Sequence, residues 1–170
     1  PNEVMLDFIK DIKKEVVKIN FLIGNLLKLS RFDVNAVHMA NNANNLKDII
    51  EASAKNVAVL CDLKGVRIEC NAENMVLNCD FNWQVEALTN IIKNCVEHSF
   101  KGGVVTINTS ENKIYTLVEI EDNGCGIARE DLPHIFDRFY RGKNSDKESI
   151  GIGLALAKSI IEKSGGKIDV

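Results

Sequence analysis

The sequence predicts an α+β sandwich, in which helices cover one face of a mixed β-sheet, preceded by a long bundle helix. Three observations predict this fold class: an apolar heptad repeat near the start, short runs of alternating apolar and polar residues, and two amphipathic segments that end at glycine. We expect the bundle helix over residues 1–33, a linker over 34–44 and one globular domain over 45–170.

Composition narrows the classes of function. A chain of 170 residues can bury one good core. The net charge of -3 provides no basic surface for nucleic acid or an anionic membrane. No apolar run approaches the roughly 20 residues of a membrane span. The five cysteines are odd in number and lack CxxC spacing, so we expect reduced thiols in a cytoplasmic protein.

The first zone carries apolar residues spaced alternately four and three apart, which predicts one long helix with a heptad seam. The seam consists of Met5, Ile9, Ile12, Val16, Ile19, Ile23 and Leu26. Phe8, Leu22 and Leu27 widen it, which favours a four-helix bundle over a two-stranded coil. The alternative is an amphipathic helix packed on its own domain. The polar segment "RFDVNAVHMANNANN" marks the boundary.

The second zone mixes helices and strands. We expect Asp80 to cap one of the helices, a hairpin turn near 110–112, and a polar loop over 140–150. The expected helices span 45–65, 81–100, 129–139 and 151–166. The expected strands span 66–70, 74–80, the two arms of the hairpin in 102–122, and 167–170.

In the stretch "VEIEDNGCGI", a strand ends at the carboxylate of Asp122, and a loop with two glycines follows it. By the two-residue alternation of a strand, Asp122 shares a face with Ile114, Val118 and Ile120, toward the covered side of the sheet. Its oxygens need donors there. Either nearby backbone amides supply them in an Asx turn, or a ligand supplies an exocyclic amine. Glycines two apart would let the loop approach that ligand closely.

Two further elements point to a phosphate-bearing ligand. Asn90 and Asn94 lie one turn apart on the 81–100 helix, and neutral amides can ligate Mg²⁺ whose charge is met by phosphate. The alternative for such a pair is a solvated helix face. In "SIGIGLALA", Gly151 and Gly153 precede an apolar helix, whose bare amides and dipole favour an anion.

The order of these elements strongly resembles the catalytic and ATP-binding domain of sensor histidine kinases, a branch of the ATPase superfamily that includes gyrase, Hsp90 and MutL. "NIIKNCVEHS" resembles the N box, "DNGCGI" the G1 box, "FDRFY" the F box and "GIGLALAKSII" the G2 box. The resemblance covers 45–170 and implies the Bergerat-type ATP-binding fold. The first zone, ending in "LLKLSRFD", resembles the second helix of the dimerisation and histidine-phosphotransfer bundle.

The resemblance implies ATP and Mg²⁺ as cofactors and assigns roles by motif position. Asp122 would accept from the adenine amino group, and Ile127 would pack on the base. Asn94 would ligate Mg²⁺ with Asn90 assisting, and Arg141 would reach the phosphates. The residues expected to bind the cofactor are Asn94, His98, Asp122, Gly124, Gly126, Ile127, Phe139, Tyr140, Arg141, Gly151, Gly153 and Leu154; those expected in catalysis are Asn90, Asn94 and Arg141. Phe136 and Phe139 would anchor a lid over 140–150.

The sequence departs from the family pattern at several places. Glu97 stands where many relatives have a lysine near the phosphates, so we expect weaker phosphate binding or compensation by Lys143 or Lys147. None of the three histidines, His38, His98 and His134, lies in a phosphoacceptor box, and the last strand and final glycine box are missing. We therefore expect a fragment that cannot label itself with phosphate.

The function expected is the ATP-binding part of a two-component sensor kinase that transfers the γ-phosphoryl group to a histidine outside the fragment. Its expected partners are a response regulator receiver domain and a second copy of the bundle helix. We expect the cytoplasmic portion of a membrane-anchored bacterial sensor. The alternatives are a non-catalytic or serine-directed nucleotide-binding module of the same superfamily, and a gyrase-like ATPase switch. The switch would need a glutamate base at position 90, where an amide cannot serve.

Overall fold

The computed structural model describes residues 3–142 and 150–170, with side chains from residue 5 onward. The chain divides into two compact units, Pro1–Val37 and His38–Val170. The part of the expected lid over 143–149, with Lys143 and Lys147, lies outside the described residues.

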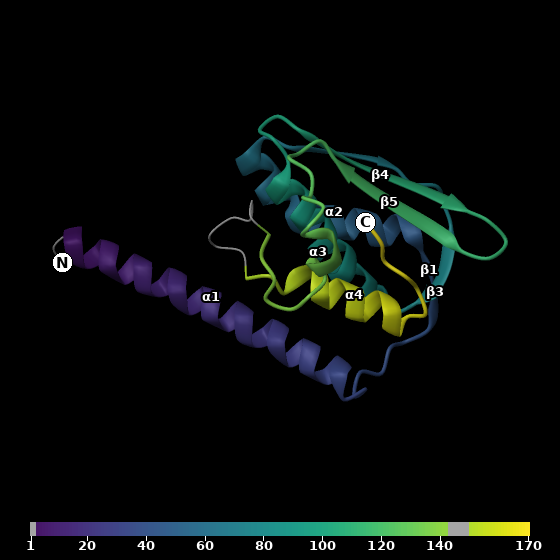
Figure 1. The fold of residues 1–170 in the computed structure, drawn as a ribbon, viewed down its shortest axis with the longest axis horizontal. Helices are drawn as coiled ribbons and strands as arrows, with labels where there is room; N and C mark the ends of the chain where they lie inside the picture. Colours follow the sequence, from purple (N-terminus) through teal and green to yellow (C-terminus); the bar gives the residue numbers. More distant parts are fainter. Residues whose placement is uncertain (1–2, 143–149) are drawn as a thin grey trace. The chain divides into compact units, whose positions relative to one another are not determined.

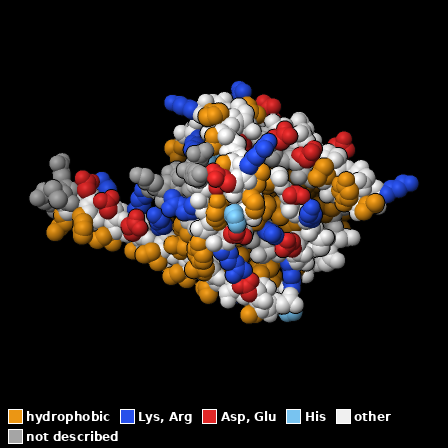
Figure 2. Space-filling model, viewed as in Figure 1, with side chains coloured by type: hydrophobic (Ala, Val, Ile, Leu, Met, Phe, Trp, Pro, Cys, Tyr) orange, Lys and Arg blue, Asp and Glu red, His pale blue; other side chains and the backbone are white. Residues whose placement is uncertain are grey.

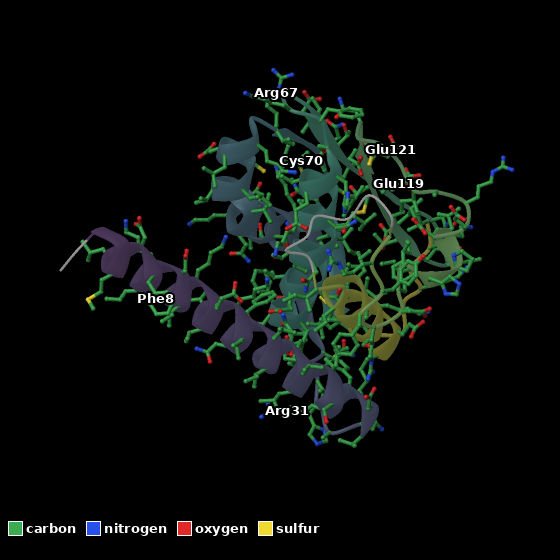
Figure 3. All side chains as sticks on the ribbon, turned by 60° about the vertical axis from the view of Figure 1, so that its left-hand side comes forward. Phe8, Arg31, Arg67, Cys70, Glu119 and Glu121 are labelled. Atoms are coloured by element: carbon green, nitrogen blue, oxygen red, sulfur yellow. The ribbon has the colours of Figure 1, made fainter. Side chains whose placement is uncertain are left out.

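The first unit is a single helix, α1 (Glu3–Asp33), as the heptad repeat predicts. Its seam residues remain exposed: Ile9, Val16 and Ile23 each keep about half of their surface accessible. Phe8 projects from the same helix with 65% of its surface exposed (Figure 3). Hydrophobic side chains run along this helix in the space-filling view (Figure 2). Exposed apolar surface of this extent is typical of a surface that packs against another helix.

The second unit contains three α-helices, five strands and one 3₁₀ helix among the described residues. In chain order these are β1 (Asn42–Asn45), α2 (Leu46–Lys64), β2 (Arg67–Asn71), β3 (Val76–Cys79), α3 (Phe81–His98), β4 (Val104–Glu111), β5 (Thr116–Asp122), η1 (Leu132–His134) and α4 (Gly153–Lys163).

The helix boundaries follow from local chemistry. The Asp80 side chain accepts a hydrogen bond from the Trp83 amide at 3.1 Å, so it caps α3 as predicted. Gly65 closes α2 in the left-handed conformation at φ 67°, which glycine adopts at little cost. Asn45 caps the start of α2 by accepting from the Lys47 amide.

The strands form two sheets. β1 pairs antiparallel with β3, while β2 pairs parallel with β4 and β4 pairs antiparallel with β5. In Figure 1, α2 and α3 lie behind the β4–β5 hairpin, and α4 lies beside α3. Val118 and Ile120 of β5 pack against the core, whereas Glu119 and Glu121 alternate onto the exposed face (Figure 3). The mixed sheet with helices on one face confirms the predicted fold class.

The core lies between the helices and the three-stranded sheet. Its fully buried members come from α2, α3 and β4 and include Ile49, Ile50, Ile92, Val96, Val105 and Ile107. On α4, the apolar face formed by Ala155, Leu156, Ala157 and Ile160 is also buried. Burial of this face aligns α4 along α3, which brings the start of one helix beside the middle of the other.

Four expectations about local structure are wrong. Residues 129–139 form turns and a 3₁₀ helix of three residues, because Pro133 has no amide hydrogen to donate and Phe139 turns to φ 63°. Residues 167–170 form no strand, since they pair with no described strand. Residues 42–44, expected in the linker, form β1 together with Asn45. Ile114 is 89% exposed in the hairpin turn, outside the alternation of β5.

Among the described residues, no helix combines the length and the apolarity that crossing a membrane requires.

Candidate nucleotide-binding site

The α3 asparagine pair meets the start of α4. Asn90 Nδ2 donates to the Glu86 carbonyl oxygen at 3.0 Å, which leaves its side-chain oxygen as an available acceptor. That oxygen faces Gly153, because a Cβ built on Gly153 would lie 3.0 Å from Asn90 Oδ1. Asn94 follows one turn later and is half-buried. The structure thus brings the second glycine of "GIG" against the first asparagine of the pair.

The end of α3 meets the glycine loop after β5. A Cβ built on Gly124 would lie 2.7 Å from the His98 carbonyl carbon and would overlap its oxygen, so only glycine fits there. The Gly124 amide donates to Asp122 Oδ1 at 2.8 Å. The Asx turn is therefore present, yet a carboxylate has about four acceptor positions, so Asp122 keeps capacity for a ligand amine.

A buried thiol lies beside the Asp122 carboxylate. Burial of Cys95 in the core is the largest cause that raises its pKa to about 12, and the nearby charge and hydrogen bonding of Asp122 contribute to the same rise. Cys95 therefore stays protonated and can donate its S–H to the carboxylate.

The F box and the G2 box are joined through their backbones. The Phe139 amide donates to the Gly151 carbonyl oxygen at 2.8 Å. A Cβ built on Gly151 would overlap the Tyr140 carbonyl oxygen and lie 2.8 Å from the Phe139 carbonyl carbon. Gly151 is also left-handed at φ 73°, so both space and conformation require glycine. Leu154 follows within the first turn of α4.

Asp131 is a site residue that sequence reasoning missed. It is 7% exposed, and its Oδ1 accepts from the Tyr140 hydroxyl at 2.7 Å. This hydrogen bond is the largest of the causes that raise the pKa of Tyr140. The only local signal was an acid before "LP", which indicates a helix cap. Nearby, the His134 and Tyr140 rings lie 5.3 Å apart, and Lys158 Nζ lies 5.6 Å from the Phe136 ring.

Other predicted residues are placed less specifically. Gly126 is left-handed at φ 67° with no atom within 4 Å of a built Cβ, and the adjacent Ile127 is 42% exposed. His98 contributes to the site through its backbone carbonyl, which lies against Gly124. Arg141 is exposed and follows Tyr140 directly. Glu97 forms an ion pair with Lys93 at 3.6 Å, so a cation accompanies the acid that departs from the family pattern.

The described residues contain no cluster of three or more His, Cys, Asp or Glu side chains that could hold a metal ion. Neutral amide oxygens of the protein and oxygens of the ligand itself could hold a divalent cation at this site. Mg²⁺ bound with a nucleotide is held in this way, since it keeps few protein ligands. The Asn90 and Asn94 amides fit that chemistry.

Comparison with known proteins agrees with this geometry. Residues 80–170 match the family described as histidine kinase-, DNA gyrase B-, and HSP90-like ATPase. Sensor protein SrrB of Staphylococcus aureus (strain NCTC 8325 / PS 47) is 30% identical over 171 residues, covering 92% of this chain and 27% of the relative. The chain thus spans about a quarter of the length of the curated relatives that it matches.

Solved structures share the fold. The Acinetobacter baumannii histidine kinase AdeS aligns with a TM-score of 0.77 at 24% identity, covering 95% of this chain and 74% of that one. Histidine kinase ThkA, solved in complex with the response regulator protein TrrA, aligns with a TM-score of 0.73 at 18% identity, covering 98% and 46%. The family match spans more than half of the chain and contains the glycine and asparagine contacts described above, and the chain belongs to the histidine kinase-, DNA gyrase B- and HSP90-like ATPases.

Proposed function

We propose that this chain is the ATP-binding catalytic part of a two-component sensor histidine kinase. Its γ-phosphoryl acceptor would be a histidine outside residues 1–170, since His38, His98 and His134 lack the phosphoacceptor context. The observation that carries the proposal is the convergence of two glycine motifs on one helix. Gly153 packs against Asn90 in the middle of α3, and Gly124 packs against His98 at its end.

The residues between these two contacts line the proposed nucleotide path. Asp122 accepts from the adenine amino group while its Asx turn holds the carboxylate in place. The open space beside Gly126 receives the base. Arg141, Gly151 and Gly153 contact the phosphate chain, with the α4 N-terminus favouring its negative charge. Catalysis then consists of positioning and charge neutralisation, as in other phosphoryl transfers.

Mg²⁺ would be held by Asn94, with Asn90 assisting, and would neutralise charge on the phosphates. Asn90 holds its amide in position through its bond to the Glu86 carbonyl. Removing that donor would leave the Asn90 oxygen free to rotate away from Gly153.

The remaining parts of the parent protein are inferred from relatives. We infer that α1 belongs to a dimerisation and phosphotransfer bundle and pairs with a second copy of the same helix. A response regulator receiver domain is the proposed partner of the parent kinase, because ThkA was solved with such a protein. The chain would be the cytoplasmic portion of a membrane-anchored bacterial sensor.

Calorimetry with ATP and GTP tests the adenine assignment. We expect ATP to bind in the presence of Mg²⁺ and GTP to bind much more weakly. Asp122→Ala should weaken ATP by roughly 1–3 kcal/mol, because a buried donor on adenine loses its acceptor. The control is Asp62→Ala, which removes an exposed carboxylate at the end of α2. Equal affinity of the unchanged chain for ATP and GTP would contradict the role of Asp122.

Phosphoryl transfer is tested with radiolabelled ATP. The chain alone should acquire no acid-labile phosphohistidine. A supplied bundle domain that carries an acceptor histidine should be labelled, and Asn94→Ala should abolish that labelling. Label that appears on the chain alone would contradict the assignment of the acceptor to another segment.

A further inference from the structure

We propose that Asp131 is a positioning residue that holds the backbone on both sides of Arg141, and through it sets how well the site discriminates between phosphate chains. This inference rests on the proposed function. It assigns a role to a buried carboxylate that no sequence motif identifies.

Asp131 sits where an acid normally caps a helix, yet it does not cap. It occupies the N-cap position of η1, and the structure shows no hydrogen bond from its side chain to that helix. Its carboxylate instead extends toward the F box and accepts from the Tyr140 hydroxyl at 2.7 Å. A carboxylate on a residue that is only 7% exposed requires such a partner, because burial of an unpaired charge is costly.

The second carboxylate oxygen meets the backbone two residues beyond Tyr140. A Cβ built on Gly142 would lie 2.8 Å from Asp131 Oδ2, so the Gly142 backbone runs directly against that oxygen. One carboxylate therefore contacts residues 140 and 142. Arg141 is the residue between them, and its side chain is exposed.

The same segment is held from its other side. The Phe139 amide donates to the Gly151 carbonyl, and the Tyr140 carbonyl packs against Gly151. Phe139 is left-handed at φ 63°, a conformation that costs roughly 1–2 kcal/mol for a residue with a side chain. Such strain persists only where surrounding contacts over-determine it, and it is concentrated at functional sites. Asp131 and Gly151 together provide those contacts.

The consequence is specific to the phosphate end of a nucleotide. Loss of the carboxylate contact would leave Arg141 on a looser backbone, while the Asp122 end of the site would keep its own turn. We therefore expect variants at Asp131 and Tyr140 to weaken binding of ATP without weakening binding of adenosine.

The test measures ATP, ADP and adenosine affinity by calorimetry with the whole chain and Mg²⁺. The mildest variant is Tyr140→Phe, which removes only the hydroxyl. Asp131→Asn removes the charge and replaces one acceptor oxygen by an NH₂ donor. The matched control is Tyr115→Phe, because Tyr115 is the only other tyrosine and lies at the hairpin turn. Tyr140→Phe should weaken ATP by about three- to tenfold and leave adenosine within about twofold.

A cycle with Arg141→Ala separates positioning from general structural support. In the Arg141→Ala background, Tyr140→Phe should change the ratio of ATP to ADP affinity by less than about twofold. Equal weakening of ATP and adenosine, no effect of Tyr140→Phe on ATP, or an undiminished effect without Arg141 would each overturn the proposal. Failure of the unchanged chain to bind ATP would instead overturn the proposed function.

Discussion

Gly124 is the position where a single methyl group should be least tolerated for a purely spatial reason. A Cβ there would lie 2.7 Å from the His98 carbonyl carbon, whereas ordinary van der Waals contact begins at about 3.4 Å. Two of the obstructing atoms, the His98 carbonyl oxygen and carbon, are backbone at the end of α3 and cannot rotate away; the third, Asp122 Oδ1, also lies 2.7 Å from the built Cβ. Gly124→Ala must therefore displace either the loop or the last turn of the helix.

The expected loss of stability in Gly124→Ala can be estimated from the kind of strain that it causes. Overpacking against groups that cannot move costs about 1–3 kcal/mol. Displacement of the loop also removes the hydrogen bond from the Gly124 amide to Asp122 Oδ1, which contributes about 1.5–3 kcal/mol as a bond to a charged acceptor. We expect Gly124→Ala to lower the free energy of unfolding by about 3 kcal/mol. For a unit of this size, that corresponds to a fall in Tm of roughly 8–15 °C.

Two other glycines provide matched controls for the cost of conformation alone. Gly126 and Gly102 are left-handed, at φ 67° and 78°, and no atom lies within 4 Å of a Cβ built on either. Alanine there should cost about 1 kcal/mol of left-handed strain without any clash. Gly102 lies outside the proposed site, so Gly102→Ala measures this strain where no nucleotide binds.

Urea unfolding of the whole chain, followed by circular dichroism, measures all three variants. Gly124→Ala should lose at least twice the stability that either control loses, and it should also bind ATP more weakly, because Asp122 moves with the loop. Equal losses for Gly124→Ala and Gly102→Ala would show that the loop does not approach His98 as closely as the structure has it.

Three further predictions concern other parts of the chain. Cys95 should resist iodoacetamide in the folded chain while the exposed Cys125 reacts. The pKa of Cys95 is about 12 in the folded chain against an ordinary 9.0, so the stability that its protonated thiol contributes is complete below pH 9 and is lost as pH rises toward 12. Cys95→Ala should therefore reduce the loss of stability between pH 8 and pH 10.5, measured by urea titration at both values. An Ile12→Glu, Ile19→Glu double variant should sediment as a monomer at concentrations where the unchanged chain associates, since each isoleucine contributes about 1.5–3 kcal/mol of burial per chain; identical sedimentation and identical helix content would contradict the bundle assignment of α1. Gly24→Ala, inside α1 with no atom within 4 Å of the new methyl, should raise helix content and stabilise the helix by roughly 1 kcal/mol, measured by circular dichroism during heating.

The parts of the fold that depend on local signals could be predicted from the sequence. Asp80 and Gly65 carry their capping preferences in their own side chains, so the boundaries of α3 and α2 follow from a few neighbouring residues. The heptad seam likewise predicts α1 without reference to any partner. The family resemblance, carried by the order of the motifs, predicted that the asparagine helix and the two glycine loops lie together, and in the structure Gly153 lies against Asn90 and Gly124 against His98.

What could not be predicted depends on contacts distant in sequence. Residues 42–45 are polar and carry no strand preference, and they become β1 because β3 offers them an edge. Residues 167–170 have strand-like composition but no described partner. Asp131 looks like a helix cap in sequence, and only the folded chain reveals that Tyr140 takes its carboxylate instead.

The glycines of the two nucleotide motifs also serve the fold itself. Gly124 and Gly151 are required where backbone meets backbone: against the end of α3 in one case and against the F box in the other. Gly126, by contrast, faces open space and is required only for its conformation. A glycine motif of this kind therefore combines two requirements that respond differently to substitution. Loss of a packing glycine should lower stability and binding together, whereas substitution at Gly126 should lower ATP affinity more than stability, because a new methyl enters the space assigned to the base.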